Sequence, residues 1–166
     1  MMTGFYASNN PMAAITGVAT SSVSFGVGGA YALYQNGASV GALAYEMNKV
    51  GKLGMLVTWL LPHGVSEIQG FFVSVGAGFV LGWALINPGR RRRGEALAEA
   101  GKDAIVLMAT SIVMMFIAAP FEGYFSFNPR VPDAVKLVVA VLVACAWAAF
   151  WIGFGRGEPA PAKATE

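Results

Sequence analysis

The stretch Leu60-Leu61-Pro62-His63-Gly64-Val65-Ser66-Glu67-Ile68-Gln69-Gly70 places polar residues at the join of two apolar runs. Residues 53–61 come before it and residues 71–86 after it, and together they exceed the roughly 20 residues that a straight helix needs to cross a bilayer. Proline has no N–H to donate and clashes with the preceding turn, and glycine relaxes the backbone. We therefore predict that Pro62 and Gly64 bracket a helix break.

The only histidine of the chain, His63, lies at this predicted break. Ionisable side chains at membrane depth are costly, so they normally face a protein interior or a water-filled cavity. A helix that restarts leaves backbone N–H groups unpaired, and the carboxylate of Glu67 is placed to accept hydrogen bonds from them. We predict one buried polar cluster made of His63 and Glu67, with Gln69 or Glu46 contributing.

Composition places the chain in a membrane. Of its 166 residues 56% are apolar and only 12% are charged, whereas about a quarter of residues are charged in a soluble domain. Because apolar runs of about 18 or more residues recur, we predict an all-α, polytopic helical membrane protein in contact with the lipid bilayer. The net charge of +2 is small and the arginines gather in one loop, so nucleic acid is not an expected partner. Cys145 is the only cysteine, which excludes an intrachain disulfide.

Hydropathy predicts four full spans, at residues 12–34, 65–86, 104–119 and 134–154. A turn is expected at Asn36-Gly37, after the first span. Residues 38–47 and 55–61 are each too short to cross a membrane, and they flank a polar tip. This pair of half-helices fits either a re-entrant hairpin or two helices that lie at the interface.

Charge predicts the orientation. Asn87-Pro88-Gly89 ends the second predicted span, and it is followed by four consecutive arginines, Arg90, Arg91, Arg92 and Arg93. Arginines beside a span are retained in the cytoplasm, and four spans bring both ends of the chain to one side. We therefore expect a multi-pass protein of the cell inner (plasma) membrane with both termini in the cytoplasm. A lead of residues 1–10 precedes the single transmembrane domain, residues 11–156, and a disordered cytoplasmic tail, residues 157–166, follows it.

Glycines mark a predicted packing face in the second span. Gly78 and Gly82 form a GxxxG pair, and small residues allow helix backbones to approach closely in lipid. We predict that this face packs helices together, and a homodimer is one assembly that it would allow.

Several functions fit these residues. His63 and Glu67 share a helix face and could form an acid/base pair or hold a metal weakly, but no cluster with metal-ligand spacing supports a site. We therefore expect no enzymatic activity, no metal and no cofactor. Two interpretations remain for the polar residues, a structural role in a membrane complex with other membrane proteins, which we prefer, and a proton or solute path in a transporter or channel. Glu122, in the third loop, is either a buried partner or an interfacial residue.

A resemblance supports the structural interpretation. The elements Leu61-Pro62-His63-Gly64-Val65-x-Glu67, Gly82-Trp83-Ala84-Leu85, Pro88-Gly89-Arg90 and Glu122-Gly123 resemble the stage II sporulation protein M family of integral membrane proteins. The resemblance extends from about residue 5 to about residue 152. It implies a scaffold in a membrane complex, which in spore-forming bacteria works with peptidoglycan-degrading partners during engulfment of the forespore. Most relatives occur in organisms that make no spores.

Overall fold

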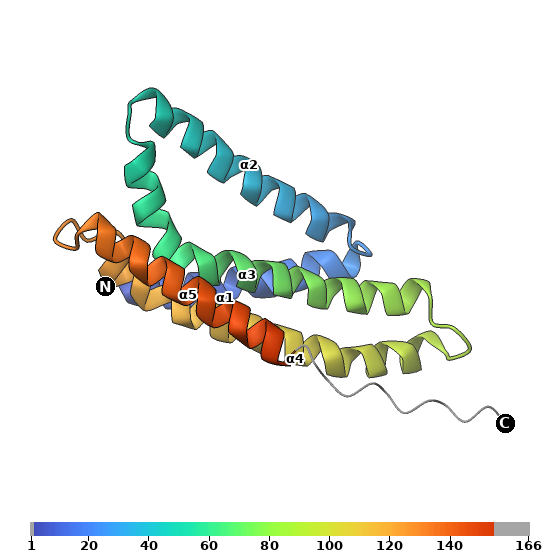
Figure 1. The fold of residues 1–166 in the computed structure, drawn as a ribbon. Coiled ribbons are helices and arrows are strands. Elements are labelled where there is room, and N and C mark those ends of the chain that lie inside the picture. The colour runs from blue at the N-terminus through green and yellow to red at the C-terminus, as the bar shows by residue number, and fades with distance from the viewer. Residues whose placement is uncertain (1, 155–166) are drawn as a thin grey trace.

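A computed structural model of the protein describes the backbone of residues 2–154 and the side chains of residues 10–153. This part of the chain is helical and contains no strand, so the predicted all-α class is confirmed. Its elements are α1 (Met2–Val23), α2 (Val27–Lys49), α3 (Leu53–Ile86), α4 (Arg93–Pro120), the π-helix η1 (Phe121–Ser126) and α5 (Asp133–Phe154), shown in Figure 1. Three stretches are long and apolar enough to cross a membrane, namely α3, the continuous run Arg93–Ser126 and residues Asp133–Gly153 of α5.

The central helix is α3. Helices α1, α4 and α5 pack along it, and α2 lies to one side of the bundle (Figure 1). The core between these helices consists mainly of small or unbranched side chains that are at most 1% exposed: Ala14, Val75, Ala77, Met114, Met115, Ala118 and Ala119. Such residues permit close helix contact, which van der Waals packing requires in lipid.

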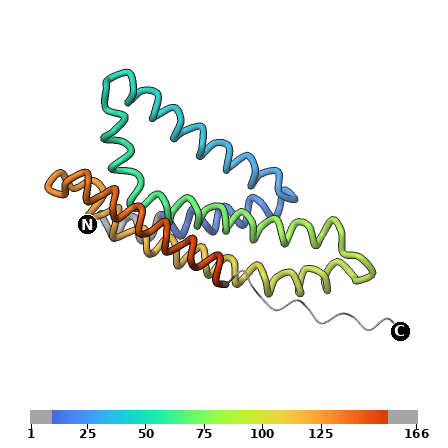
Figure 2. Tube along the Cα trace, in the orientation of Figure 1, coloured from blue at the N-terminus to red at the C-terminus, as the bar shows by residue number. Residues whose placement is uncertain are grey.

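The predicted break at Pro62–Gly64 is wrong, because α3 continues as one helix from Leu53 to Ile86. The helix bends instead, and its first turns point away from the long remainder (Figures 1 and 2). Proline removes one intrahelical hydrogen bond and clashes with the preceding turn, so it kinks a helix. The helix does not end there when neighbouring elements hold both of its halves. Pro62 lies inside α3, and both Pro62 and Gly64 are buried.

The predicted first span is also wrong, because the chain reverses inside it. Helix α1 ends at Val23, and α2 begins at Val27. The turn uses a left-handed backbone at Phe25 (φ 53°) and Gly26 (φ 96°), and the Gly26 N–H donates to the Ser21 carbonyl over 2.7 Å. This bond satisfies a carbonyl that the end of α1 would otherwise leave unpaired. Asn36 and Gly37, where a turn was expected, lie within the continuous helix α2.

The predicted half-helices are parts of longer ones. Residues 38–47 belong to α2 and residues 55–61 to α3, and a turn at Val50–Lys52 joins the two helices. The other three predicted spans fall within α3, α4 and α5. Since α1 and α2 form a hairpin, α1 begins and α5 ends toward opposite ends of the bundle (Figure 1). The prediction that both ends of the chain lie on one side rested on four spans and does not agree with this arrangement. The predicted tail, residues 157–166, lies outside the described residues.

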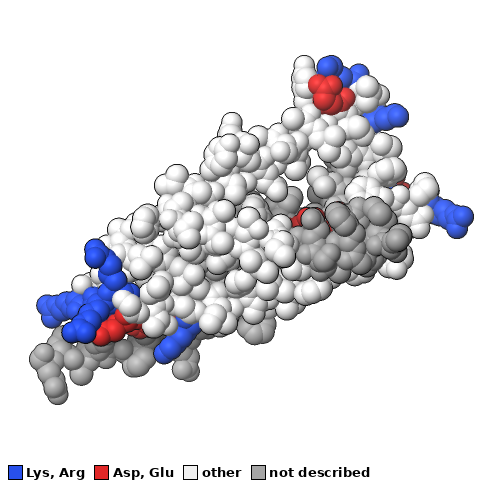
Figure 3. All heavy atoms as spheres, turned by 180° about the vertical axis from the view of Figure 1, so that it is seen from behind, with Lys and Arg blue, Asp and Glu red and all other residues white. Residues whose placement is uncertain are grey.

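Charge lies mainly at the two ends of the molecule (Figure 3). We call them the η1 end, which holds η1 and the loop 127–132, and the arginine end, which holds the loop 87–92. The middle of the molecule is almost free of charge in this view, as expected for a body that lies in a membrane.

Candidate functional site

The buried histidine lies just after the bend of α3. His63 is 2% exposed, and its Nδ1 lies 2.9 Å from the Ser126 hydroxyl oxygen in a buried hydrogen bond. The Phe127 ring lies against the imidazole, with ring centroids 5.5 Å apart. The other ring nitrogen, Nε2, faces the Glu67 carboxylate one helical turn later, at 3.9 Å from Oε2. The predicted pairing of His63 with Glu67 is therefore present as a close approach beyond hydrogen-bond length.

A second carboxylate, that of Glu122, comes from η1. His63, Glu67 and Glu122 each offer a ligand atom, and these atoms all lie within 4.8 Å of one another. Glu122 is on η1, a wide helical turn of the kind that often occurs at functional sites. Asn10 of α1, which is 2% exposed, donates from Nδ2 to Glu122 Oε2 over 3.2 Å. Three elements thus converge on one polar cluster, which we define as His63, Glu67, Glu122, Asn10 and Ser126.

The polar cluster lies on the wall of a pocket of about 380 Å³. The pocket lies between α2 and the rest of the bundle. Its lining comes from α1, α2, α3, α4, η1 and the loop after η1: Ala13, Asn36, Val40, Leu60, His63, Gly64, Glu67, Ile68, Phe71, Met115, Glu122 and Phe127. Figure 3 shows acidic atoms within a recess of the otherwise uncharged middle of the molecule. The carboxylates are therefore reachable from outside the protein.

No lysine or arginine in the described part of the chain pairs with the carboxylates of this cluster. Among the described residues, the ion pairs of lysine and arginine are Lys49 with Glu46, Arg91 with Glu99 and Lys136 with Asp133, and none of them reaches Glu67 or Glu122. Two carboxylates this close in an apolar region are unfavourable unless a proton or a cation lies between them. No cluster with metal-ligand spacing is visible in the sequence, but the fold brings Glu122 to His63 and Glu67 as a third potential ligand.

Two residues predicted for the cluster lie elsewhere. Glu46 is exposed near the end of α2 and pairs with Lys49 at 3.2 Å, so its predicted contribution is wrong. Gln69 lies on another face of α3, where its Oε1 accepts a 2.9 Å hydrogen bond from Trp151 Nε1. On the same side of α3, Trp147 Nε1 donates to the Ser66 hydroxyl over 2.8 Å. These two indoles fasten α5 to α3.

The predicted glycine face packs within the chain. A Cβ added at Gly78 would lie 2.4 Å from Ser21 Cβ, and one added at Gly82 would lie 3.0 Å from Phe25 Cα. Both glycines therefore let α1 and its turn approach α3, and Ser21 Oγ also donates to the Val75 carbonyl over 3.1 Å. Because α1 covers this face, it does not offer a surface for a homodimer.

The four arginines that predict the membrane orientation, residues 90–93, lie in and next to the loop at the arginine end. Arg91 pairs with Glu99, and the Arg92 N–H donates to Glu95 Oε2 over 3.2 Å. Arg93 Nε donates to the Leu85 carbonyl over 3.2 Å, which ties the start of α4 to the end of α3. The first turns of α4 thus neutralise part of the arginine charge.

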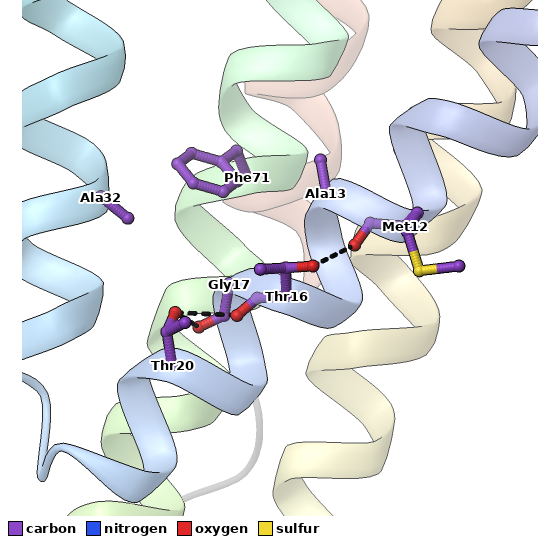
Figure 4. A pocket seen from close by; sticks show the side chains of 7 residues that line it. All are labelled: Met12, Ala13, Thr16, Gly17, Thr20, Ala32 and Phe71. Atoms are coloured by element: carbon purple, nitrogen blue, oxygen red, sulfur yellow. Dashed lines mark hydrogen bonds between the residues drawn. The ribbon is translucent and has the colours of Figure 1, made fainter.

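A second hollow, of about 390 Å³, lies between α1, α2 and α3 (Figure 4). Its polar groups are used by α1 itself, since Thr16 Oγ1 donates to the Met12 carbonyl over 2.9 Å and Thr20 Oγ1 to the Thr16 carbonyl over 2.7 Å. Phe71 and Ala32 supply apolar walls. This hollow is therefore a packing gap and offers no charged group to a ligand.

The bundle and its polar pocket define a helical membrane protein with an ionisable cluster near one end. The sequence profile described as Stage II sporulation protein M matches residues 1–127, and the chain belongs to that family. Every residue that lines the polar pocket falls within the matched range, whereas α5 lies outside it.

An archaeal protein is similar to part of this chain. An uncharacterized protein of Methanocaldococcus jannaschii is 30% identical over 107 residues, which cover 63% of this chain and 60% of that protein. The match thus spans less than two thirds of the length of that relative. No solved structure matches.

Sequence reasoning missed Asn10 and Ser126 and left Glu122 undecided. The one available signal was Glu122 itself, an acid two residues after Pro120 at the end of an apolar run. The other two are ordinary polar residues, and only the fold brings them to the histidine.

Proposed function

We propose that this protein is a non-enzymatic component of a membrane complex, and that α2 is the surface that receives a partner. The observation that carries the proposal is the exposure of α2, in which Gly29 is the only buried residue. Tyr31, Tyr34 and Tyr45 are 61%, 68% and 64% exposed on this helix. The family resemblance supports the same role, and in a spore-forming organism it implies partners that remodel peptidoglycan.

The depth of α2 makes this exposure costly. At its start, Gly26 packs against the Phe79 ring of α3. At its end, a short turn joins Lys49 to the first residue of α3, Leu53. Helix α2 thus runs beside a helix that has the length and composition of a membrane span. Exposed Gln35, which lies outside the pocket lining, cannot form hydrogen bonds with lipid tails.

We propose that the partner surface is a transmembrane helix of another membrane protein that carries hydrogen-bonding side chains. Such side chains associate helices in lipid, where apolar contact alone gives little driving force. The exposed face of α5 differs, because Leu137, Val138, Val141 and Leu142 are purely apolar and lipid satisfies them. We propose the arginine loop as cytoplasmic, which places the η1 end and the polar pocket toward the other face of the membrane.

Site-specific photo-crosslinking in native membranes tests this proposal. A photoreactive amino acid at Tyr34 should give an adduct with a second membrane protein, and the same group at Val138 should react only with lipid. Gln35→Leu should reduce the Tyr34 adduct without changing the amount of folded protein. An adduct with a second copy of this chain, or equal adducts from both positions, would contradict the proposal.

Transport is the less supported function. A solute path from the pocket toward the arginine end would have to pass residues that are fully buried and apolar, such as Ala14, Val75 and Met114. The pocket gives access to the carboxylates from one side, and the buried serines beyond it, Ser21, Ser74 and Ser111, each donate their hydroxyl to a backbone carbonyl within the bundle. Glu67→Gln separates the two functions, since a carrier should lose flux while it remains folded and assembled.

A further inference from the structure

We propose that the polar pocket is a binding site for one divalent transition-metal cation, of the chemical class of Zn²⁺, held by His63, Glu67 and Glu122. This inference goes beyond the docking role of α2 and does not depend on it. It rests on the placement of three potential ligands from two elements around one open space.

The donor set fits such a cation. Imidazole nitrogen and carboxylate oxygen are both ligands of Zn²⁺, at about 2.0–2.2 Å from the metal. Two ligand atoms of a tetrahedral Zn²⁺ lie about 3.3–3.6 Å apart at these bond lengths, and the three potential ligand atoms lie within 4.8 Å of one another. A small movement of the partly exposed Glu67 side chain would therefore close the set.

The histidine is oriented for ligation. Its Nδ1 lies 2.9 Å from Ser126 Oγ, and when Nδ1–H donates to that hydroxyl, Nε2 carries the lone pair that faces the carboxylates. A ring that is 2% exposed cannot turn toward bulk water. Metal-binding histidines almost always donate their other N–H to such a second group, which fixes the tautomer.

One of the carboxylates is oriented in the same way. Asn10 Nδ2 donates to Glu122 Oε2 over 3.2 Å, which leaves the other oxygen of Glu122 for a cation. His63 and Glu122 are thus each held by a hydrogen bond, and the partly exposed Glu67 is free to adjust. The imidazole ligand favours Zn²⁺ over Mg²⁺, because Mg²⁺ prefers oxygen ligands and bound water.

The charge and shape of the pocket agree with a cation. Two carboxylates without a lysine or arginine partner among the described residues have a net negative charge that a divalent ion would neutralise. The opening between α2 and the bundle offers a route for the ion and room for further ligands, such as water. Since Glu122 is bonded to α1 and His63 belongs to α3, the ion would also fasten three elements together.

Metal binding to the purified full chain tests the proposal. The protein would be prepared in nanodiscs, freed of any affinity tag and treated with a chelator, and Zn²⁺ would be titrated by calorimetry. We expect one Zn²⁺ per chain, a rise in melting temperature on binding, and no competition from a hundredfold excess of Mg²⁺. Co²⁺ in place of Zn²⁺ should give visible absorption bands that report nitrogen and oxygen ligands.

Matched variants locate the ion. Glu67→Gln and Glu122→Gln keep the side-chain shape, and each should weaken Zn²⁺ binding at least tenfold, because outer contacts alone change metal affinity by about 10- to 100-fold. Ser126→Ala should weaken binding about tenfold through the histidine. Glu46→Gln, which changes an exposed acid outside the pocket, should leave binding unchanged.

Folding of each variant is checked by its circular dichroism and by its melting temperature without metal. A folded Glu67→Gln protein that binds Zn²⁺ as tightly as the natural sequence would overturn the site. Displacement of Zn²⁺ by equal concentrations of Mg²⁺ would overturn the transition-metal class. If Glu122→Gln does not fold, the partly exposed Glu67 still decides the outcome, because its variant tests the same ligand set.

Discussion

Asn10 and Glu122, 112 residues apart in the chain, are joined by a 3.2 Å hydrogen bond inside the bundle. The bond connects α1 to η1 at the η1 end, and Asn10 is 2% exposed. Among the described residues, this is the only side-chain hydrogen bond between α1 and η1. This bond therefore joins α1 to a carboxylate that also belongs to the polar pocket.

Removal of this amide should destabilise the bundle. Asn10→Ala leaves the Glu122 carboxylate without its donor, and an unsatisfied buried group costs about 1–3 kcal/mol, with more for a charged one. The free energy of unfolding would be measured by denaturant titration in mixed micelles. Asn36→Ala is the control, because Asn36 is exposed on α2 and should change stability little. Equal effects of the two substitutions would show that the Asn10 bond contributes nothing.

The local part of this cluster could be predicted from sequence, but the distant part could not. His63 and Glu67 are four residues apart, so any helix brings them to one face. Glu122, Asn10 and Ser126 join them only because α1, α3 and η1 meet at one end, and no spacing in the sequence encodes that meeting. The prediction that Glu46 joins the cluster was wrong for the same reason. Glu46 is close to the histidine in the sequence, but the fold places it at the exposed end of α2.

The helix boundaries show where local signals compete with packing. Pro62 predicts a break, but the neighbours of α3 hold both halves of a bent helix together. The turn at Phe25 and Gly26 lies inside an apolar run that is long enough to span, so hydropathy hides it. Composition, by contrast, suffices for the all-helical class and for the positions of the long apolar parts of α3, α4 and α5.

A double-mutant cycle should find coupling between His63 and Ser126. Their side chains share a buried 2.9 Å hydrogen bond, so His63→Ala and Ser126→Ala each leave the other group unsatisfied. The two changes together should cost less than their sum, with a coupling energy of about 0.5–3 kcal/mol. The pair His63 and Gln69 is the control, because Gln69 bonds to Trp151 on another face and its effect should add. Additive effects for both pairs would mean that the serine does not hold the histidine.

Cysteine labelling should place the two ends of the bundle on opposite sides of the membrane. Arg92→Cys and Arg130→Cys would be made in a Cys145→Ala background, since Cys145 is exposed and would react. We expect an impermeant thiol reagent to label position 130 in intact cells and position 92 only after the membrane is opened, because arginines beside a span stay in the cytoplasm. The reverse pattern would invert the orientation and with it the side from which the pocket opens.

The glycines of α3 should differ sharply in their tolerance of a methyl group. A Cβ at Gly78 would lie 2.4 Å from Ser21 Cβ and 2.7 Å from the Val18 carbonyl oxygen, whereas a Cβ at Gly76 would meet no atom within 4 Å. Gly78→Ala should therefore force α1 away from α3 and destabilise the bundle by about 1–3 kcal/mol, the usual cost of overpacking.

Gly76→Ala is the matched control for Gly78→Ala. It should be neutral or stabilising by up to about 1 kcal/mol, because alanine is the better helix former. Melting temperature in nanodiscs and particle mass would be measured for both variants. Since the Gly78 face packs inside one chain, Gly78→Ala should lower the melting temperature without changing the mass of the particle. A change in oligomer size with unchanged stability would instead assign this glycine face to contact between chains.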